Sequence, residues 1–268
     1  AQRLEAQVGE VVREAEAVAR TLSSNAVLQQ RTEALAAAQA PDSTEAMGQK
    51  FADPKPPGTL RVLLVGSGSS HDFPKFFLGQ DAVTLKAAGG IDIAATPNRD
   101  EALALLPLAD VLVFSGNHDH YGAPEFQKAL NDFADASKGI VLLHAATWDH
   151  PRWAGYNERF VGGRTPSHGK GLFEVTVKDA DSPLTAGVPA SFKITDENYR
   201  FEIQSKAKVD VCCYNAPDGG KDPLPSVWTV KDPKTRIVCI TLGHDGDAHG
   251  HPAYQKLLVN AVNYVGSR

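Results

Sequence analysis

The residues best suited to do chemistry are histidines that follow apolar runs. The sequence contains nine histidines, and His144 comes directly after Gly139–Leu143, a run without a polar residue. His71, His168 and His244 also fall where loops are expected to leave strands. In an open parallel sheet, ligands bind outside the carboxyl ends of the strands, so a titratable group there is a candidate functional residue. The pattern suggests one site to which several imidazoles contribute.

Imidazole-rich, partly open sites suit zinc or a similar first-row ion, so a divalent metal is the cofactor we expect. A single histidine is more often a structural residue with satisfied hydrogen bonds than a ligand. The metal hypothesis therefore depends on whether the histidines converge in space, and both interpretations stay open at the level of the residues. The same holds for the histidine-rich segment Asn117–His120 and for His249 and His251.

A second group of candidates lies in Asp196-Glu197-x-Tyr199 and at Trp228. Glu197 has the chemistry of a general base or of a metal ligand. The rings of Tyr199 and Trp228 could stack on the face of a sugar, and they could equally belong to the edge of the core. The residues alone give these interpretations similar weight.

Covalent catalysis by cysteine or serine is not expected. Cys212, Cys213 and Cys239 have no CxxC spacing and fall inside predicted strands, where a free cysteine behaves as a small hydrophobic residue. There is no Gly-x-Ser-x-Gly motif. An odd, small number of cysteines does not indicate a disulfide framework, so the redox compartment stays open.

Two glycine-containing motifs imitate known sites without completing them. Gly66-x-Gly68 is half of a dinucleotide fingerprint, and its glycines are better explained by a tight turn that presents His71. Asp245–Gly250 resembles the first half of a calcium loop. The twelfth position of that loop requires a bidentate glutamate and holds Lys256, which excludes an EF-hand.

The composition limits the class of partner. The chain has 268 residues and a net charge of −5, and it lacks a dense block of Lys or Arg, so we expect no nucleic acid partner. No apolar run of membrane-spanning length occurs. A small neutral or weakly charged ligand fits better. The chain begins with Ala-Gln rather than methionine, which fits an exported protein. We therefore expect a periplasmic or secreted location, with the cytoplasm as the alternative.

The elements that must position these residues alternate between strand and helix. Apolar, near-continuous strands separated by amphipathic helices predict an α/β fold with a doubly wound, mostly parallel sheet. After His144 the pattern changes to strands with little helix between them, which predicts an antiparallel extension of the sheet. The expected strands are 60–65, 91–94, 110–114, 139–143, 172–178, 192–194, 209–214, 225–230 and 236–242, and the expected helices are 81–88, 98–106, one that begins at Pro124, and 252–265.

The amino-terminal part has a different composition. Residues 1–40 are rich in Ala, Glu and Gln, and apolar residues from Leu4 to Leu22 step by four and three, as in a coiled-coil seam. This seam either packs on the chain's own domain or joins subunits in a homo-oligomer. The proline cluster Pro54–Gly58 marks the expected boundary, with a helical segment and linker at 1–58 and an α/β domain at 59–268.

In order along the chain, these pieces resemble the ThuA-like (trehalose utilisation) family, a variant of the class I glutamine amidotransferase fold. The resemblance covers about residues 60–267 and leaves residues 1–58 outside. The matching segments are Ser70-His71-Asp72, Gly139–Ala146, Trp153 with Tyr156, Gly162-Gly163 with His168, Asp181–Thr185, Asp196–Tyr199, Val227-Trp228 and Leu242–His244. Two features depart from the family pattern: Ser182 stands where histidine is common, and Asn117–His120 is an unusual insert.

The resemblance implies a site and a class of function. It implies that His71, His144, His168, Glu197 and His244 belong to the family's site, and that a histidine occupies the elbow where amidotransferases carry their nucleophilic cysteine. We expect two or three of the four histidines to hold the metal, with Glu197 and His144 as the catalytic residues. Substrate contacts are expected from Trp153, Tyr156, Tyr199 and Trp228. The leading hypothesis is an enzyme that acts on a sugar or keto-sugar by hydrolysis, isomerisation or elimination. The alternative is a non-catalytic sugar-binding or assembly protein.

Overall fold

The structure is a computed structural model, and it describes residues 49–116, 121–148, 153–204, 208–217 and 222–267. The predicted amino-terminal helices, their coiled-coil seam, the subunit contact through residues 1–40 and the insert Asn117–His120 lie outside the described residues. Of the helices that the structure describes, none combines the length and the apolar character needed to cross a membrane.

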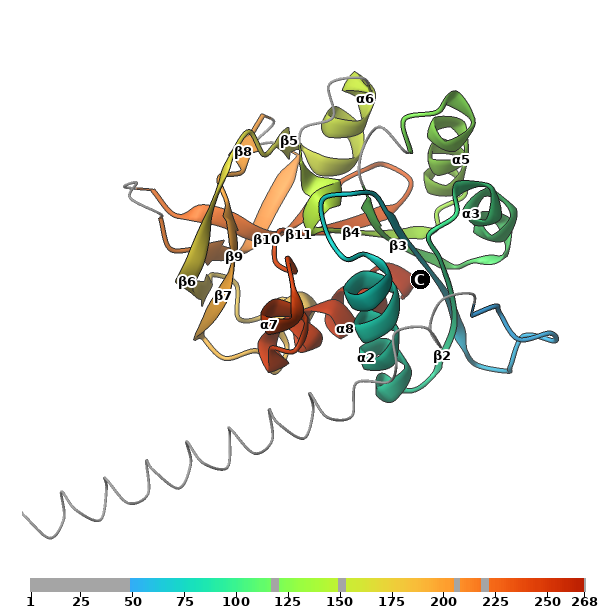
Figure 1. The fold of residues 1–268 in the computed structure, drawn as a ribbon, viewed down its shortest axis with the longest axis horizontal. Coiled ribbons are helices and arrows are strands. Elements are labelled where there is room, and N and C mark those ends of the chain that lie inside the picture. Colours follow the sequence, from blue (N-terminus) through green and yellow to red (C-terminus); the bar gives the residue numbers. More distant parts are fainter. Residues whose placement is uncertain (1–48, 117–120, 149–152, 205–207, 218–221, 268) are drawn as a thin grey trace, which may run out of the picture. The chain divides into compact units, whose positions relative to one another are not determined.

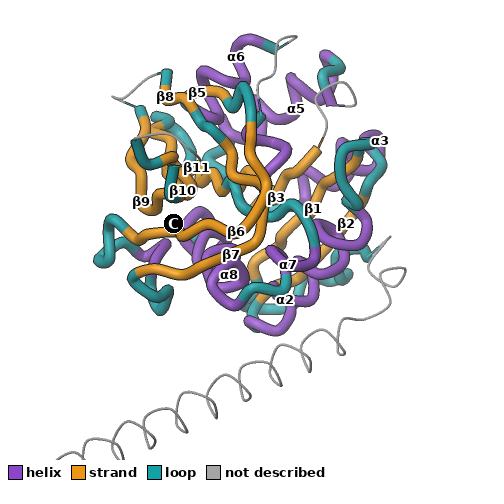
Figure 2. The backbone as a smooth tube through the Cα atoms, turned by 60° about the vertical axis from the view of Figure 1, so that its left-hand side comes forward, coloured by secondary structure: helices purple, strands orange, loops and turns teal. Residues whose placement is uncertain are grey.

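Within the described residues, nine strands form one sheet in the order β2-β1-β3-β4-β11-β10-β9-β6-β7 (Figures 1 and 2). The first five are parallel: β2 (Ile91–Thr96), β1 (Leu60–Ser67), β3 (Val111–Gly116), β4 (Gly139–Leu143) and β11 (Arg236–Ile240). The other four are antiparallel: β10 (Leu224–Lys231), β9 (Val209–Asn215), β6 (His168–Val177) and β7 (Ser191–Tyr199). The predicted parallel sheet with an antiparallel extension is confirmed, but the strand expected at 236–242 was assigned to the extension and belongs to the parallel part as β11. Strands β5 (Gly163–Arg164) and β8 (Glu202–Ile203) pair separately.

Helices cover both faces of the parallel strands (Figure 1). One face packs against α2 (Asp81–Ala88), α7 (Gly246–His249) and α8 (Pro252–Gly266), and the other against α3 (Arg99–Leu105), α5 (Pro124–Asp135) and α6 (Ala154–Tyr156). Successive residues of a strand point to opposite faces, so Val62 and Leu64 join the first core while Leu63 and Val65 join the second. A strand buried on both faces must be apolar throughout, which explains the uninterrupted runs in the sequence.

Local sequence signals explain where the helices begin. The Asn98 side chain accepts the N–H groups of Asp100 and Glu101 and caps α3, while Pro124 and Pro252 occupy the first positions of α5 and α8. The predicted helices are therefore confirmed within one or two residues. Several helical segments were not expected, among them a π-helical turn at Pro74–Gln80 that runs into α2, α6 with the helical turn at Asn157–Val161, and α7.

The segment just before β1 is attached to the sheet. The Ala95 N–H donates to the Gln49 carbonyl at 3.0 Å, and Lys55 pairs with Asp110 at 2.6 Å. Residues 49–58, which we assigned to the linker, therefore contact the α/β domain. The division of the chain at residue 58 stays a prediction.

Candidate metal centre

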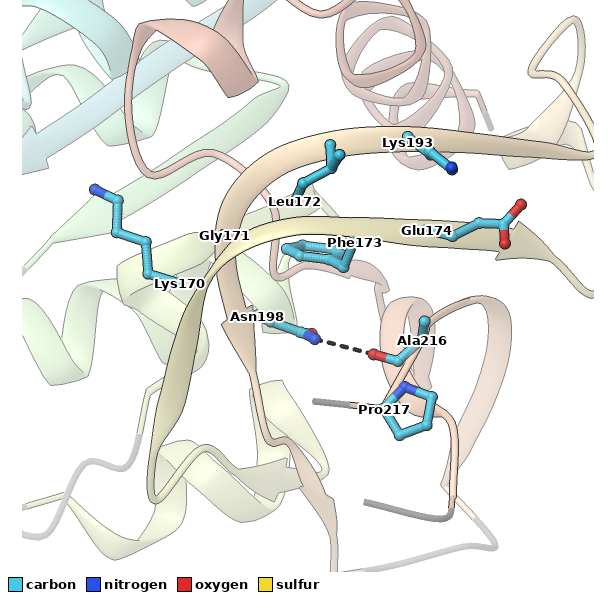
Figure 3. Close-up of a pocket in the computed structure, with 9 residues that line it drawn as sticks. All are labelled: Lys170, Gly171, Leu172, Phe173, Glu174, Lys193, Asn198, Ala216 and Pro217. Atoms are coloured by element: carbon cyan, nitrogen blue, oxygen red, sulfur yellow. Dashed lines mark hydrogen bonds between the residues drawn. The ribbon is translucent and has the colours of Figure 1, made fainter. Parts of the chain in front are cut away.

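Three histidines and one glutamate converge at the carboxyl ends of the strands. His71 follows β1, His144 ends β4 and His244 follows β11, and these strands are parallel, so their carboxyl ends meet at one edge. Glu197 comes from β7, in a hairpin with β6 that curves strongly (Figure 3). One ligand atom of each of the four residues lies within 4.8 Å of the others. We call these four residues the quartet.

Glu197 lies at the centre of the quartet. Its Oε2 is 3.3 Å from His144 Nε2 and 3.8 Å from His71 Nε2, and its Oε1 is 3.2 Å from His244 Nδ1. Zinc bonds of about 2.0–2.1 Å in a tetrahedral site place neighbouring ligand atoms about 3.3–3.4 Å apart. Two of the three separations between Glu197 and the histidines fall close to this value. The four ligand atoms lie within 4.8 Å of one another, so the side chains would have to close in around a bound ion. The donor set of nitrogens and a carboxylate is also the one that zinc prefers.

The hydrogen bonding of His144 determines its tautomer. The residue is fully buried, and its Nδ1 lies 2.6 Å from the Thr241 carbonyl oxygen. A carbonyl can only accept, so Nδ1 carries the proton and donates. Burial lowers the pKa of His144 to about 4, even though Glu197 opposes this shift. At neutral pH the ring is therefore neutral and presents the lone pair of Nε2 to Glu197.

Glu197 faces that lone pair as a carboxylate. Burial acts to raise the pKa of Glu197, and it is outweighed by hydrogen bonds from His144 and His71, which lower the pKa when the facing ring nitrogens carry a proton. A lone pair and a carboxylate oxygen 3.3 Å apart repel each other unless a cation or a proton lies between them. The arrangement is therefore suited to a bound cation.

The other two histidines carry ring nitrogens without partners. Among the described residues, His71 Nε2 and His244 Nδ1 are buried and have no hydrogen-bond partner. A buried polar atom in this state costs about 1–3 kcal/mol. The opposite nitrogen of His71 lies 2.6 Å from Ser70 Oγ, which orients the ring. Both unpartnered nitrogens face Glu197, where a metal ion would satisfy them.

Asp196 holds two members of the quartet in place. Its carboxylate accepts the backbone N–H groups of Glu197 at 2.7 Å, Gly243 at 2.8 Å and His244 at 2.9 Å. Burial raises the pKa of Asp196 to about 6, although these hydrogen bonds favour the charged form. Asp196 was noted in the sequence as part of a motif, but this role was not predicted.

His168 lies outside the quartet, at the solvent-exposed edge of the site, which we call the rim. Its side chain is 39% exposed, and its Nδ1 is 3.5 Å from Glu197 Oε1. Trp148, which the sequence did not single out, contacts His168 and Tyr199 with ring centroids 5.6 Å and 5.3 Å apart. Tyr199 packs in turn on His144, with centroids 4.3 Å apart. An aromatic wall therefore runs from the rim to the quartet.

Tyr156 and Trp228, two of the residues predicted to contact substrate, lie in the core and not at the quartet. Both have 0% exposure. The Tyr156 hydroxyl donates to the Ala146 carbonyl at 2.6 Å, and the Trp228 indole donates to the Val161 carbonyl at 2.9 Å. These two rings are core residues whose polar atoms are already bonded.

Trp153 is not at the quartet either. It is 8% exposed and lines a cavity of about 330 Å³ beside Arg159 and Asp232. No member of the quartet lines that cavity.

The cysteines agree with the expectation of no thiol nucleophile. Cys212 and Cys213 lie in β9 and Cys239 in β11, and all three are buried, free thiols. Burial raises the pKa of Cys213 to about 12 and that of Cys239 well above its usual value. A thiol that stays protonated is a poor nucleophile.

A separate cavity of about 370 Å³ opens on the β6–β7 hairpin (Figure 3). Leu172, which is 67% exposed, and Phe173 line it. Asn198 also lines it and donates to the Ala216 carbonyl at 2.9 Å, as the dashed line in Figure 3 marks. None of the quartet residues lines this cavity, so it is not the candidate site.

Comparison with known proteins places the chain in a family. A family model described as ThuA, trehalose utilisation, matches residues 61–265. The chain belongs to the ThuA family. All four quartet residues lie inside this ThuA domain. The family description supports a sugar-related role. A search of curated proteins found no match.

Solved structures agree on the fold of the ThuA domain. A ThuA-like protein from Bacteroides uniformis has a TM-score of 0.66 and 18% identity, over 81% of this chain and 95% of that one. A ThuA-like protein from Parabacteroides merdae has a TM-score of 0.60 and 17% identity, over 78% of this chain and 90% of that one. PurLQS from Thermotoga maritima has a TM-score of 0.51 and 12% identity, over 77% and 99%. At such identities the likeness concerns the fold alone.

Proposed function

We propose that the ThuA domain is a carbohydrate-active enzyme whose quartet binds one divalent metal ion, zinc or a similar first-row ion. The observation that carries the metal part is the unpartnered state of His71 Nε2 and His244 Nδ1 beside Glu197. The neutral tautomer of His144 supports it, because that ring offers a lone pair to the same point. The carbohydrate part is supported by the family.

His144 and Glu197 have different tasks in this proposal. Bound at the quartet, the metal supplies a Lewis acid, which polarises a substrate carbonyl or activates a water. His144 is fully buried and has both ring nitrogens engaged, so it holds the metal and does not touch the substrate. Because the pKa of Glu197 is lowered, its Oε1, on the side of His168, can accept a proton only from a group whose acidity a bound metal has raised, and exposed His168 can pass that proton to solvent.

This division of tasks suits reactions that begin with proton removal beside a polarised oxygen. Hydrolysis of a glycoside derivative needs a water deprotonated by a base, and isomerisation or elimination of a keto-sugar needs a proton removed next to the carbonyl. Glu197 can serve each of them without a covalent intermediate. We therefore propose a general-base reaction on a sugar or keto-sugar.

The rim offers contacts that suit a sugar ring. Trp148 is half-buried and stands beside His168 and Tyr199, so its ring can stack on the C–H face of a pyranose. Lys170 in β6 pairs with Asp245 at 3.4 Å, and such a pair can bind neighbouring hydroxyls of a sugar. We assign substrate contact to Trp148 in place of the buried Tyr156 and Trp228.

The metal part is tested by the metal content of protein purified without a histidine tag and then equilibrated with zinc, manganese or iron(II). We expect about one equivalent of one ion per chain, and much less for Glu197→Gln and His244→Ala. His251→Ala is the matched control, because this histidine caps α8 and lies outside the quartet. Binding of less than about a tenth of an equivalent by the native chain would refute the metal centre.

The enzymatic part needs its own measurement. We expect the metal-loaded protein to consume a member of a panel of glycosides and keto-glycosides, and Glu197→Gln to lose that activity. If Glu197→Gln and His144→Ala leave every sugar-dependent signal unchanged, the protein is a sugar-binding or assembly protein rather than an enzyme.

A further inference from the structure

Behind the quartet lies a second polar cluster that the proposed reaction does not use. Asp81 at the start of α2, His249 in α7 and Tyr254 in α8 have no exposed surface. His249 Nδ1 lies 2.7 Å from Asp81 Oδ1, and the Tyr254 hydroxyl donates to Asp81 Oδ2 at 3.1 Å. No substrate can reach this cluster. Any effect on the site must therefore pass through the groups that the cluster binds.

The cluster binds the peptide that precedes a quartet residue. His249 Nε2 donates to the Gly243 carbonyl oxygen at 3.0 Å. The same peptide unit carries the N–H of His244, which donates to Asp196 Oδ1 at 2.9 Å. A peptide unit is planar, so hydrogen bonds at both its oxygen and its N–H hold its orientation. That orientation determines where the Cα and the side chain of His244 lie.

We propose that His249, oriented by Asp81, is a positioning residue of the metal centre and that it acts by holding the Gly243–His244 peptide. This inference rests on the proposed function, since it treats His244 as a metal ligand. When a group that orients a metal ligand without touching the metal is lost, the metal affinity typically falls by about 10- to 100-fold.

The donor on His249 Nε2 persists in either protonation state of the pair. Burial raises the pKa of Asp81, although the contact with His249 opposes the shift. If Asp81 is ionised, it accepts the Nδ1 proton of a charged His249. If Asp81 is protonated, it donates to Nδ1, and the neutral ring keeps its proton on Nε2. The Gly243 carbonyl is bonded in both cases.

The packing around Gly243 leaves this peptide little freedom. Gly243 has a φ of +114°, a conformation that favours glycine. A Cβ atom there would lie 3.1 Å from the Tyr254 hydroxyl oxygen and 3.3 Å from His249 Nε2. The cluster therefore packs directly on the segment that it orients, and the loss of the His249 side chain would open space for the peptide to turn.

Three variants of the full chain separate positioning from simple packing. His249→Leu removes the donor and keeps a similar volume, whereas His249→Gln can place an amide N–H near the position of Nε2. His251→Ala is the control, because it removes a histidine two residues away that caps α8. The measurements are the zinc affinity by competition with a chelator and the visible absorption spectrum of the cobalt(II) form, which reports coordination geometry.

We expect His249→Leu to weaken zinc binding about 10- to 100-fold and to change the cobalt spectrum, with His249→Gln close to the native protein and His251→Ala unchanged. Native affinity and spectrum in His249→Leu would overturn the positioning role while the metal centre stands. If the native chain binds no metal, both proposals fail. If His249→Leu does not fold, Tyr254→Phe replaces it, because this variant removes only the hydroxyl that holds Asp81. We expect a smaller loss of zinc affinity in Tyr254→Phe, and unchanged zinc binding there would overturn the positioning role.

Discussion

The buried, neutral state of His144 leads to a prediction about how stability depends on pH. Burial lowers the pKa of His144 from 6.5 to about 4 in the folded chain. In the unfolded chain the ring takes up a proton below its ordinary pKa of about 6.5, while in the folded chain it stays neutral down to about 4. The unfolded state therefore binds more protons in this window. The contribution of His144 to stability must fall as the pH falls from 6.5 towards 4.

The size of the effect follows from the two pKa values. Each unit of difference corresponds to about 1.36 kcal/mol, so the complete loss for His144 is about 3 kcal/mol. Between pH 7 and pH 5 the linkage relation gives about 2 kcal/mol, because the unfolded ring is almost fully charged at pH 5 and the folded ring is still almost fully neutral. A loss of this size is a large part of the stability of a typical domain.

The decisive comparison is with His144→Asn. His144 has a φ of +42°, and asparagine tolerates this left-handed conformation better than other non-glycine residues. The asparagine N–H₂ group can also donate to the Thr241 carbonyl as Nδ1 does. The variant thus removes the titrating ring while it keeps the backbone and one hydrogen bond. Its stability should depend less on pH than that of the native chain, by about 2 kcal/mol between pH 7 and pH 5.

Urea unfolding followed by tryptophan fluorescence measures this difference, with a chelator present because bound metal would compete with protons. Asp196 acts in the opposite direction, since its pKa is raised to about 6 and the folded chain binds the extra proton as the pH falls. Both proteins share that contribution, so the difference between them reports His144 together with its effect on Glu197. Equal losses of stability in the two proteins would refute a buried neutral ring at this position.

Three further outcomes follow from the site. His168→Ala should leave zinc affinity within about three-fold of native, because His168 lies at the rim, whereas Glu197→Gln should lower it at least about 100-fold; equal losses in chelator competition would contradict this division. Trp148→Ala should weaken sugar binding about ten-fold by calorimetry with metal content unchanged, and Trp148→Phe should weaken it less; native affinity in Trp148→Ala would remove the stacking role. Gly243→Ala should destabilise the chain by about 2–3 kcal/mol in urea, since its Cβ would crowd Tyr254 in a strained conformation; an unchanged midpoint would be inconsistent with the φ of Gly243.

The parallel half of the fold was predictable because its signals are local. A strand buried on both faces must be apolar along its length, and Gly139–Leu143 and Leu60–Val65 are apolar or nearly so. Parallel strands bring their carboxyl ends to one edge, so the residues that follow them become neighbours. That rule places His71 and His144 together, whereas the strand before His244 was assigned to the antiparallel extension, and its parallel pairing with β4 became clear only in the structure.

The contribution of Glu197 could not be derived in the same way. β7 lies at the opposite end of the sheet order from the parallel strands, and only the curvature of its hairpin with β6 brings Glu197 to the quartet. The sequence predicted a strand at 192–194, whereas the strand runs to Tyr199, because polar residues at its end are buried against the site. Curvature has no simple signature in a single sequence.

Aromatic residues were the least predictable part of the site. Tyr156 and Trp228 are buried and Trp148 is half-buried, and the sequence contains no sign that separates them, since each ring is apolar with one polar atom. The Asp81–His249 contact was equally hidden, because 168 residues separate its two members. Contacts of that kind depend on how α2 and α7 pack and not on any spacing in the chain.

The turn at His144 also restricts the chemistry. His144 has a positive φ at the point where β4 ends, so the chain makes the sharp turn that could present a nucleophile there. The side chain at that turn is instead fully buried, with Nδ1 bonded to Thr241 and Nε2 directed at Glu197. The three thiols are buried in strands, with pKa values raised by burial. Neither the turn nor the thiols therefore offer an attacking atom, and the new bond in the proposed reaction must come from water or from the sugar itself, with Glu197 as the base.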